Sequence, residues 1–188
     1  MKEKLISQIK NYTPCNEQEE VDKGLLLQLL SGGEDLTLRE HLQAHLTASA
    51  WVVTPDREKV LMAYHNLYNS WAWLGGHADG DWDLARVARR EAEEESGISA
   101  LKQVTDGPVS LEILPVFGHE KKGKYVPCHL HLNVTYLFEA DPSLDLQMKP
   151  DENSGVAWIS IAELPVKTSE PWMCQRIYSK LSRRAKEC

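Results

Sequence analysis

The sequence predicts an α/β fold that begins with a short helical segment. Asn16 and Glu19 have the spacing of a helix start, and the leucine-rich run after them ends at Ser31-Gly32-Gly33. From LTASAWVV onward, β-rich segments alternate with turn-forming residues. Two later stretches, 83–96 and roughly 170–186, have the boundary residues of helices. We therefore expect a helical extension over residues 1–45, packed on a main domain over residues 46–188.

The composition narrows the classes of function. The formal net charge of −7 argues against nucleic acid or an anionic membrane as the main partner. The first residues are too polar for a signal peptide, and no later run approaches the length of a membrane span. The cysteines are scattered, with the spacing of neither a zinc knuckle nor a disulfide framework, which favours a reducing cytoplasm: Cys15, Cys128, Cys174 and Cys188.

The second half of the chain predicts strands and a final helix. SLEILPVFGHE and CHLHLNVTYLFEA flank Lys121-Lys122-Gly123-Lys124, which suits a hairpin or loop. The second strand alternates, so His129, His131 and Asn133 share one polar face that borders either a cleft or solvent. VAWISI is a further strand. Ser169-Glu170-Pro171 then begins the last helix, which ends in basic residues.

The helix expected over 83–96, closed by Gly97, places carboxylates on its apolar side. With Leu84 at zero, Val87 lies at about 300° and Ala88 at about 40°. On the same wheel Glu91, Glu94 and Glu95 lie at about 340°, 280° and 20°, which continues the apolar stripe. The side that should face water, at about 140–200°, carries the remaining charges: Arg86, Arg89 and Glu93.

Three inward carboxylates need a compensating charge. A solvated helix face is the simplest interpretation of an acidic run, but the wheel argues against it because like charges turned inward lose hydration. A divalent cation would compensate them, and an all-oxygen donor set suits Mg²⁺ or Mn²⁺ better than Zn²⁺. Gly75 and Gly76 precede the helix; they form either a structural turn or a close backbone approach whose carbonyl completes the metal shell.

Together these residues resemble the Nudix hydrolase signature, G-x₅-E-x₇-R-E-U-x-E-E-x-G-U, where U is a bulky aliphatic residue. Trp82 stands where the signature has its first glutamate. The resemblance implies a Nudix-type α/β/α sandwich with a mixed β-sheet. It also implies Mg²⁺-dependent hydrolysis of a small-molecule diphosphate, a nucleoside diphosphate derivative, by attack of water on phosphorus. The matching positions are Gly76, Arg90, Glu91, Glu94, Glu95, Gly97 and Ile98.

The resemblance also suggests roles for individual residues. Glu91, Glu94 and Glu95 would bind the metal together with the Gly76 carbonyl, and Arg90 would orient the acidic cluster. The general base would be Glu94 or an acidic residue on a distant loop, and the segment PDENSGVAW favours Glu152 there over Asp151 or Glu120. Trp73, His129 and His131 are the candidate substrate-binding residues, beside the aromatic residues Tyr64 and Trp71, which also suit a core.

Several alternatives stay open at this stage. The loss of the first glutamate at Trp82 suits a catalytically weak or non-cleaving nucleotide-binding protein, unless Asp81 or Asp83 substitutes for it. A prenyl diphosphate isomerase is disfavoured, because a catalytic cysteine in a matched setting is missing. A transition-metal site on the histidines is a minor hypothesis, given their separation: His77, His119, His129 and His131. The helical extension would shield the cleft, cover a sheet edge or pair two subunits into a homodimer.

Overall fold

The computed structural model describes residues 1–66, 69–121, 123–148 and 153–188. Two helices come first, α1 (Lys2–Asn11) and α2 (Glu17–Leu30). The side chain of Asn16 accepts a hydrogen bond from the backbone N–H of Glu19, which confirms the predicted start of α2. None of the helices in these ranges combines the length and apolar composition that a membrane span needs.

The rest of the chain contains strands and further helices. The elements follow in the order β1 (Ala44–Val53), β2 (Lys59–His65), β3 (Ser70–Ala72), β4 (Leu74–His77), α3 (Leu84–Ser96), β5 (Lys102–Gln103), β6 (Ser110–Val116), β7 (His119–Lys121), β8 (Lys124–Val126), β9 (His129–Glu139), β10 (Asn153–Ser160), η1 (Ile161–Glu163), α4 (Leu164–Lys167), α5 (Pro171–Met173), η2 (Cys174–Tyr178) and α6 (Ser179–Glu187). β1 begins inside the segment that the sequence assigns to the extension.

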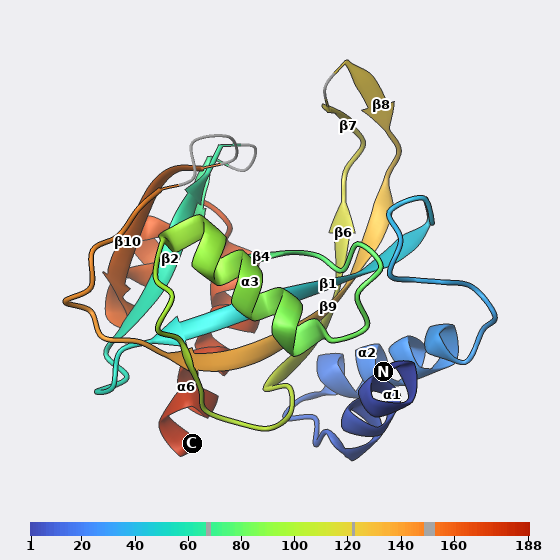
Figure 1. The fold of residues 1–188 in the computed structure, drawn as a ribbon, viewed down its shortest axis with the longest axis horizontal. Coiled ribbons are helices and arrows are strands. Elements are labelled where there is room, and N and C mark those ends of the chain that lie inside the picture. Colours follow the sequence, from blue (N-terminus) through green and yellow to red (C-terminus); the bar gives the residue numbers. More distant parts are fainter. Residues whose placement is uncertain (67–68, 122, 149–152) are drawn as a thin grey trace.

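A mixed sheet forms the centre of the fold, as expected. β1 and β9 are parallel along their whole length, from Ala44 opposite Leu130 to Val53 opposite Glu139. β2 and β4 lie antiparallel beside β1, and β5 and β6 lie antiparallel beside β9. β3 and β10 extend the same sheet by antiparallel pairing with β2. β7 and β8 form a separate hairpin that projects from the sheet (Figure 1), in agreement with the turn predicted at 121–124.

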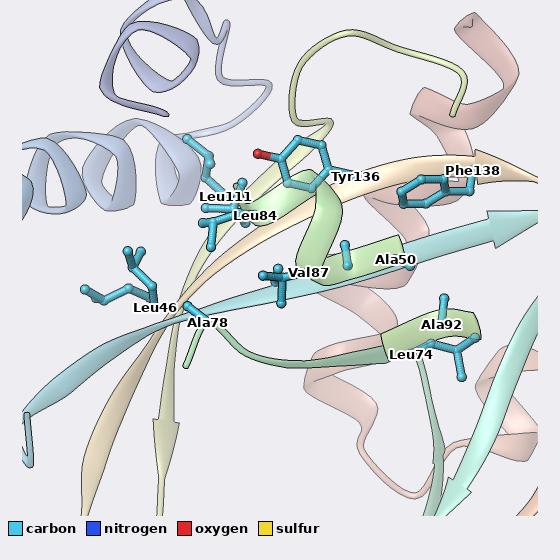
Figure 2. Packing of buried hydrophobic residues seen from close by; sticks show 14 of the residues in the cluster. Leu46, Ala50, Leu74, Ala78, Leu84, Val87, Ala92, Leu111, Tyr136 and Phe138 are labelled. Atoms are coloured by element: carbon cyan, nitrogen blue, oxygen red, sulfur yellow. The ribbon is translucent and has the colours of Figure 1, made fainter. Parts of the chain in front are cut away.

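α3 lies across one face of the sheet and buries its apolar stripe there (Figure 1). Leu84 and Val87 pack against Leu46, Ala50 and Tyr136 of the strands (Figure 2). Leu5, Ile9, Leu26 and Leu30 of the two N-terminal helices belong to the same cluster. Helices as short as α1 and α2 are marginal in isolation, so this shared burial is what stabilises them.

The C-terminal helices cover the opposite face of the sheet and complete the α/β/α sandwich. Ile177, Tyr178 and Leu181 pack there against Trp51 and Leu137. The helix predicted over roughly 170–186 is present, but it is interrupted by the wider π turn of η2. Such a turn shifts the faces of α5 and α6 relative to each other.

A buried ion network ties the N-terminal extension to the C-terminal helices. The Lys180 ammonium lies 2.8 Å from Glu19 Oε1 and 2.9 Å from Glu112 Oε1. Asn133 Nδ2 donates to Glu112 Oε2 at 3.1 Å, and Tyr12 donates to Glu19 at 2.5 Å. One cation therefore joins α2, β6 and α6 in the interior of the protein.

Candidate active site

The glycine pair in β4 brings the sheet into direct contact with α3. A Cβ atom at Gly76 would lie 2.5 Å from the carboxyl carbon of Glu91, and one at Gly75 would lie 2.5 Å from the Ala48 carbonyl oxygen. The Gly75 N–H donates to Glu95 Oε2 at 3.1 Å. Glycine is required at Gly76 because a side chain there would collide with Glu91 of α3, and at Gly75 because a side chain there would collide with the backbone of β1.

The carboxylates of α3 differ in exposure although they border one cavity. Glu95 is buried, with 5% of its surface exposed, and it accepts a hydrogen bond from Asn153 Nδ2 at 3.1 Å. The side chain of Glu91 is 16% exposed and that of Glu94 is 46% exposed. All three line the same cavity, so the stripe predicted from the helical wheel turns inward at Glu95 and toward an open cleft at Glu94.

Arg90 contacts the acidic cluster. Its Nη2 donates to Glu91 Oε1 at 2.8 Å, and its Nε lies 3.9 Å from Glu94 Oε1. The hydrogen bond to Glu91 raises the pKa of the Arg90 guanidinium above its ordinary value. Arg90 therefore stays charged and can hold Glu91 in one orientation.

The start of α3 gives Trp82 and its neighbours structural roles. Trp82 packs against the α3 side of the core, and Lys2 Nζ lies 5.2 Å from the centre of its ring. Asp83 caps the helix by accepting from the Arg86 N–H, while Asp81 pairs with the Arg86 guanidinium at 2.9 Å. The cavity-lining side chains of the described ranges include neither aspartate, so nothing supports the idea that they replace the missing glutamate.

Arg89, which was predicted to face water, does so with 34% of its side chain, the same fraction as Glu93, and also contacts the protein. Its guanidinium donates to the Leu101 carbonyl oxygen and lies 5.2 Å from the ring centre of Phe138. Arg86 is exposed, as expected. The helical wheel does not predict these two contacts, because the chain after α3 folds back over that side of the helix and a helical wheel contains no such information.

A cavity of about 830 Å³ lies between the carboxylates and the polar face of the sheet. The predicted substrate-binding residues Trp73, His129 and His131 all line it. Asn133, on the same predicted face of β9, lines it too. Its wall also contains polar and aromatic residues that the sequence does not single out as site residues: Arg39, His45, Thr47, Ser49, Asp79, Phe117, Tyr125, Asn153, Glu170, Trp172 and Tyr178. Its size and its mixed wall suit a ligand with both an apolar and an anionic part.

Histidines from three strands gather on one wall of the cavity. The ring centres of His45 and His77 are 5.0 Å apart, those of His77 and His131 are 4.9 Å apart, and those of His45 and His129 are 4.8 Å apart. Burial lowers the pKa of His77 to about 2 and that of His131 to about 3. The polar face of β9 therefore borders a cavity and not open solvent, and His45 is a member that the sequence analysis missed.

The cavity wall also contains an ion pair between an arginine and an aspartate. Arg39 and Asp79 form a bidentate pair, with 2.5 Å from Arg39 Nη2 to Asp79 Oδ2. Hydrogen bonding from Arg39 holds the pKa of Asp79 below its usual range. Arg39 and Arg90 both line the cavity, and each is paired there with a carboxylate, Arg39 with Asp79 and Arg90 with Glu91.

Other predicted residues lie elsewhere. Glu152 and Asp151 fall outside the described residues, so the structure does not test them as bases. Glu120 lies exposed on β7, which projects from the sheet, and it is not among the residues that line the cavity. The Tyr64 and Trp71 rings contact each other edge to face at 5.5 Å, also apart from the lining residues.

A family model described as "NUDIX domain" matches residues 43–178. The chain belongs to the Nudix family. A probable DHNTP pyrophosphohydrolase of Lactococcus lactis subsp. cremoris is 30% identical over 141 residues, which are 75% of this chain and 81% of that protein. A CMP-5'-(N-acetyl-N-hydroxy-3-aminopropyl)phosphonate hydrolase of Streptomyces rubellomurinus is 40% identical over 72 residues, which are 36% of this chain and only 34% of that protein.

Solved structures of other Nudix proteins share the fold. The C. elegans Ap4A hydrolase in a binary complex superposes with a TM-score of 0.56 at 20% identity, over 76% of this chain and 98% of that one. The E. coli dihydroneopterin triphosphate pyrophosphohydrolase gives a TM-score of 0.55 at 14% identity, over 74% and 95%. This Nudix protein is accordingly a hydrolase that acts on phosphoanhydride bonds.

Proposed function

We propose that this Nudix hydrolase cleaves a diphosphate linkage in a nucleoside diphosphate derivative and that it depends on Mg²⁺, with Mn²⁺ as a substitute. The observation that carries the proposal is the convergence of three α3 carboxylates, Arg90 and the β4 glycine pair on one cavity. Arg39, which is paired with Asp79, lines the same cavity, and we expect a phosphate chain to lie between the metal-binding carboxylates and this arginine.

The residues present fit a hard divalent cation. Glu91, Glu94 and Glu95 provide oxygen donors one helical turn apart, and Gly76 lies against Glu91 without an intervening side chain. These residues would hold Mg²⁺, with the Gly76 carbonyl as a further donor. When bound, Mg²⁺ would neutralise charge on the phosphate oxygens and favour attack of water at phosphorus.

Side chains of the protein would position the carboxylates and accept the proton of the attacking water. Arg90 fixes the Glu91 carboxylate through the 2.8 Å hydrogen bond. Glu94 is the most exposed of the three carboxylates, and we assign it the role of base, accepting a proton at a carboxylate oxygen as water forms a bond to phosphorus. The bridging P–O bond breaks, and the leaving phosphate group carries away the electron pair. Glu152 remains the alternative base suggested by the family resemblance.

The aromatic part of the wall supports a nucleotide-like substrate. Trp73 lines the cavity, and we propose that it contacts the base, while His129 and His131 contact the polar part of the substrate. The names of two relatives, the probable DHNTP pyrophosphohydrolase and the CMP-linked phosphonate hydrolase, favour the same substrate class. The four cysteines are free thiols, which supports action in the cytoplasm.

Glu94→Gln tests the proposal. Product release is measured from nucleoside triphosphates, nucleotide sugars, dinucleotides and dinucleoside polyphosphates, with Mg²⁺ and with a chelator. Loss of the base should lower kcat by roughly 10²–10⁴-fold. Glu93→Gln on the same helix is the matched control, because Glu93 is not among the lining residues and should keep activity. Equal activity of Glu94→Gln and the unchanged protein would remove Glu94 from the mechanism.

Trp82 motivates a second candidate, a Nudix-fold protein that binds a nucleotide derivative without cleaving it. Trp82 packs into the core at the position of the first signature glutamate, so that carboxylate is missing from the site. The same assay with Trp82→Glu decides between the two functions. Turnover by the unchanged protein supports the hydrolase, whereas calorimetric binding of a nucleotide without product, together with turnover only in Trp82→Glu, supports the binding protein.

A further inference from the structure

The four histidines on the cavity wall, His45, His77, His129 and His131, are called the histidine wall below. They lie on the face of the sheet opposite α3. Alternation along β1 sends Leu46 and Ala48 into the core under α3 and sends His45 and Thr47 to the other side. In the parallel pairing of β1 with β9, His45 is opposite His131. In the antiparallel pairing of β1 with β4, Thr47 is opposite His77. The three imidazoles therefore come from neighbouring strands and share one face, separate from the carboxylates of α3.

The ring nitrogens are close enough to share an ion. One nitrogen each of His45, His77 and His131 lies within 4.8 Å of the others. Nitrogens bound to Zn²⁺ at 2.0–2.1 Å in a tetrahedron are about 3.4 Å apart. Small side-chain rotations would close this difference, because the strands that carry the rings are already paired.

Backbone carbonyls hold two of the rings in the orientation that a metal ligand needs. His45 Nδ1 lies 3.3 Å from the His41 carbonyl oxygen, and His129 Nδ1 lies 2.8 Å from the Pro127 carbonyl oxygen. A carbonyl oxygen only accepts, so each Nδ1 carries the proton and each Nε2 presents a lone pair. Hydrogen bonds of this kind orient metal-binding histidines in other proteins.

The Nε2 atom of His45 accepts no hydrogen bond in the described parts of the chain. The His45 side chain is buried, with 4% of the residue exposed, and its Nε2 makes no hydrogen bond within the described parts of the chain. His129 Nε2 lies 3.3 Å from His131 Nε2, which is close to the separation of two ligands on one tetrahedral ion. A buried nitrogen without a partner costs stability, and a bound ion would remove that cost.

We propose that His45, His77 and His131 bind a divalent transition-metal ion of the Zn²⁺ class, with His129 as a fourth ligand. Imidazole donors favour Zn²⁺, Ni²⁺ or Co²⁺, whereas the carboxylates of α3 favour Mg²⁺. The two sites lie on opposite sides of β4, where Gly76 contacts Glu91 and the next residue, His77, belongs to the histidine wall. Both border the same cavity, so an ion on the histidines would face a bound anionic ligand.

Metal binding by the full, tag-free chain tests this site. The protein is stripped with a chelator and titrated with Zn²⁺ in excess Mg²⁺, which occupies oxygen donors without competing for imidazole. One equivalent of Zn²⁺ should bind, and Co²⁺ in its place should give the visible absorption of a four-coordinate nitrogen site. His77→Asn and His131→Asn should each weaken Zn²⁺ binding by more than about 100-fold, since second-shell changes alone cost 10–100-fold.

Two controls separate this site from its neighbours. His119→Asn should keep the affinity, because the His119 ring is 6.4 Å from that of His129 and contributes no nitrogen to the three-ligand group. Glu94→Gln should also keep it. Loss of Zn²⁺ binding in Glu94→Gln with retention in His77→Asn would place the ion on α3 and overturn the proposal. Absence of stoichiometric binding to the folded, unchanged protein would leave His129 and His131 as a hydrogen-bonded pair and would equally overturn it.

Discussion

Replacing Lys180 by Met removes an ammonium group that two buried carboxylates share. Lys180 is 2% exposed at its side chain, and the side chains of Glu19 and Glu112 are fully buried. Met has a similar length and shape, so the change removes the charge without opening a large cavity. Glu112 would keep its hydrogen bond from Asn133 but lose the ammonium that compensates its burial, whereas Glu19 would keep Tyr12 and the Arg184 guanidinium at 3.3 Å.

The expected loss of stability follows from this geometry. Removing one partner of a buried ion pair costs about 3–5 kcal/mol. For a chain of this size, about 2–4 °C of Tm is lost per kcal/mol, so Lys180→Met should lower Tm by roughly 6–20 °C. Lys186→Met on the same helix is the matched control. Lys186 Nζ lies 3.5 Å from Glu58 Oε1, and both side chains are more than half exposed, so its loss should cost less than about 1 kcal/mol.

Thermal and urea unfolding followed by circular dichroism measure both variants. Adding Glu19→Gln and Glu112→Gln to Lys180→Met should recover part of the loss, because the carboxylates are then no longer charged. Equal Tm values for Lys180→Met and Lys186→Met would refute the argument. The same result would mean that the network contributes nothing to holding the N-terminal helices on the domain.

Two further predictions concern the glycine pair and acid stability. Gly76→Ala places a methyl group 2.5 Å from the Glu91 carboxyl carbon, so Glu91 must move and kcat should fall by about 10²-fold. Gly33→Ala is the control, because Gly33 has open space around it and its replacement should not change kcat. Equal kcat values for the two variants would contradict this prediction. Burial alone would raise the pKa of Glu19, but hydrogen bonds from Lys180 and Tyr12 outweigh burial and lower the pKa from 4.5 to about 2. The folded protein thus binds fewer protons than the unfolded chain, so the stabilisation present above pH 4.5 is lost as pH falls toward 2. Urea midpoints measured against pH should show a flatter decline in Glu19→Gln, and parallel curves would contradict the assignment.

Local signals made α3 predictable from the sequence. Gly97 is a left-handed terminator, and the helix ends where it indicates; the helix begins at Leu84, one residue after the predicted start, with Asp83 as its cap. The inward turn of Glu95 follows from helical periodicity alone. The contacts of Arg89 with Leu101 and Phe138 were not predictable in the same way, because they depend on how other segments return to the helix.

The histidine wall shows the limit of sequence analysis. The alternation of β9 correctly put His129 and His131 on one face, but whether that face meets water depends on elements elsewhere in the chain. His45 and His77 join them only through the register of β1 with β9 and with β4. A single sequence contains no direct signal for that register, so His45 could not be recognised in advance.

The cavity can form only after β9 has paired with β1, which happens late in the synthesis and folding of the chain. Thr47 and Asn133 are hydrogen-bonded across 86 positions of the chain, and the ion pair of Lys180 adds a still more distant contact. Contacts of such long range form slowly, because a long loop must close before they contribute stability. During synthesis the carboxylates of α3 leave the ribosome well before β9 does, so a nascent chain has its acidic helix before it has a binding site. Activity should therefore appear only after nearly the whole domain has been made, and truncated chains should be inactive and also exposed to aggregation along the unpaired edge of β1.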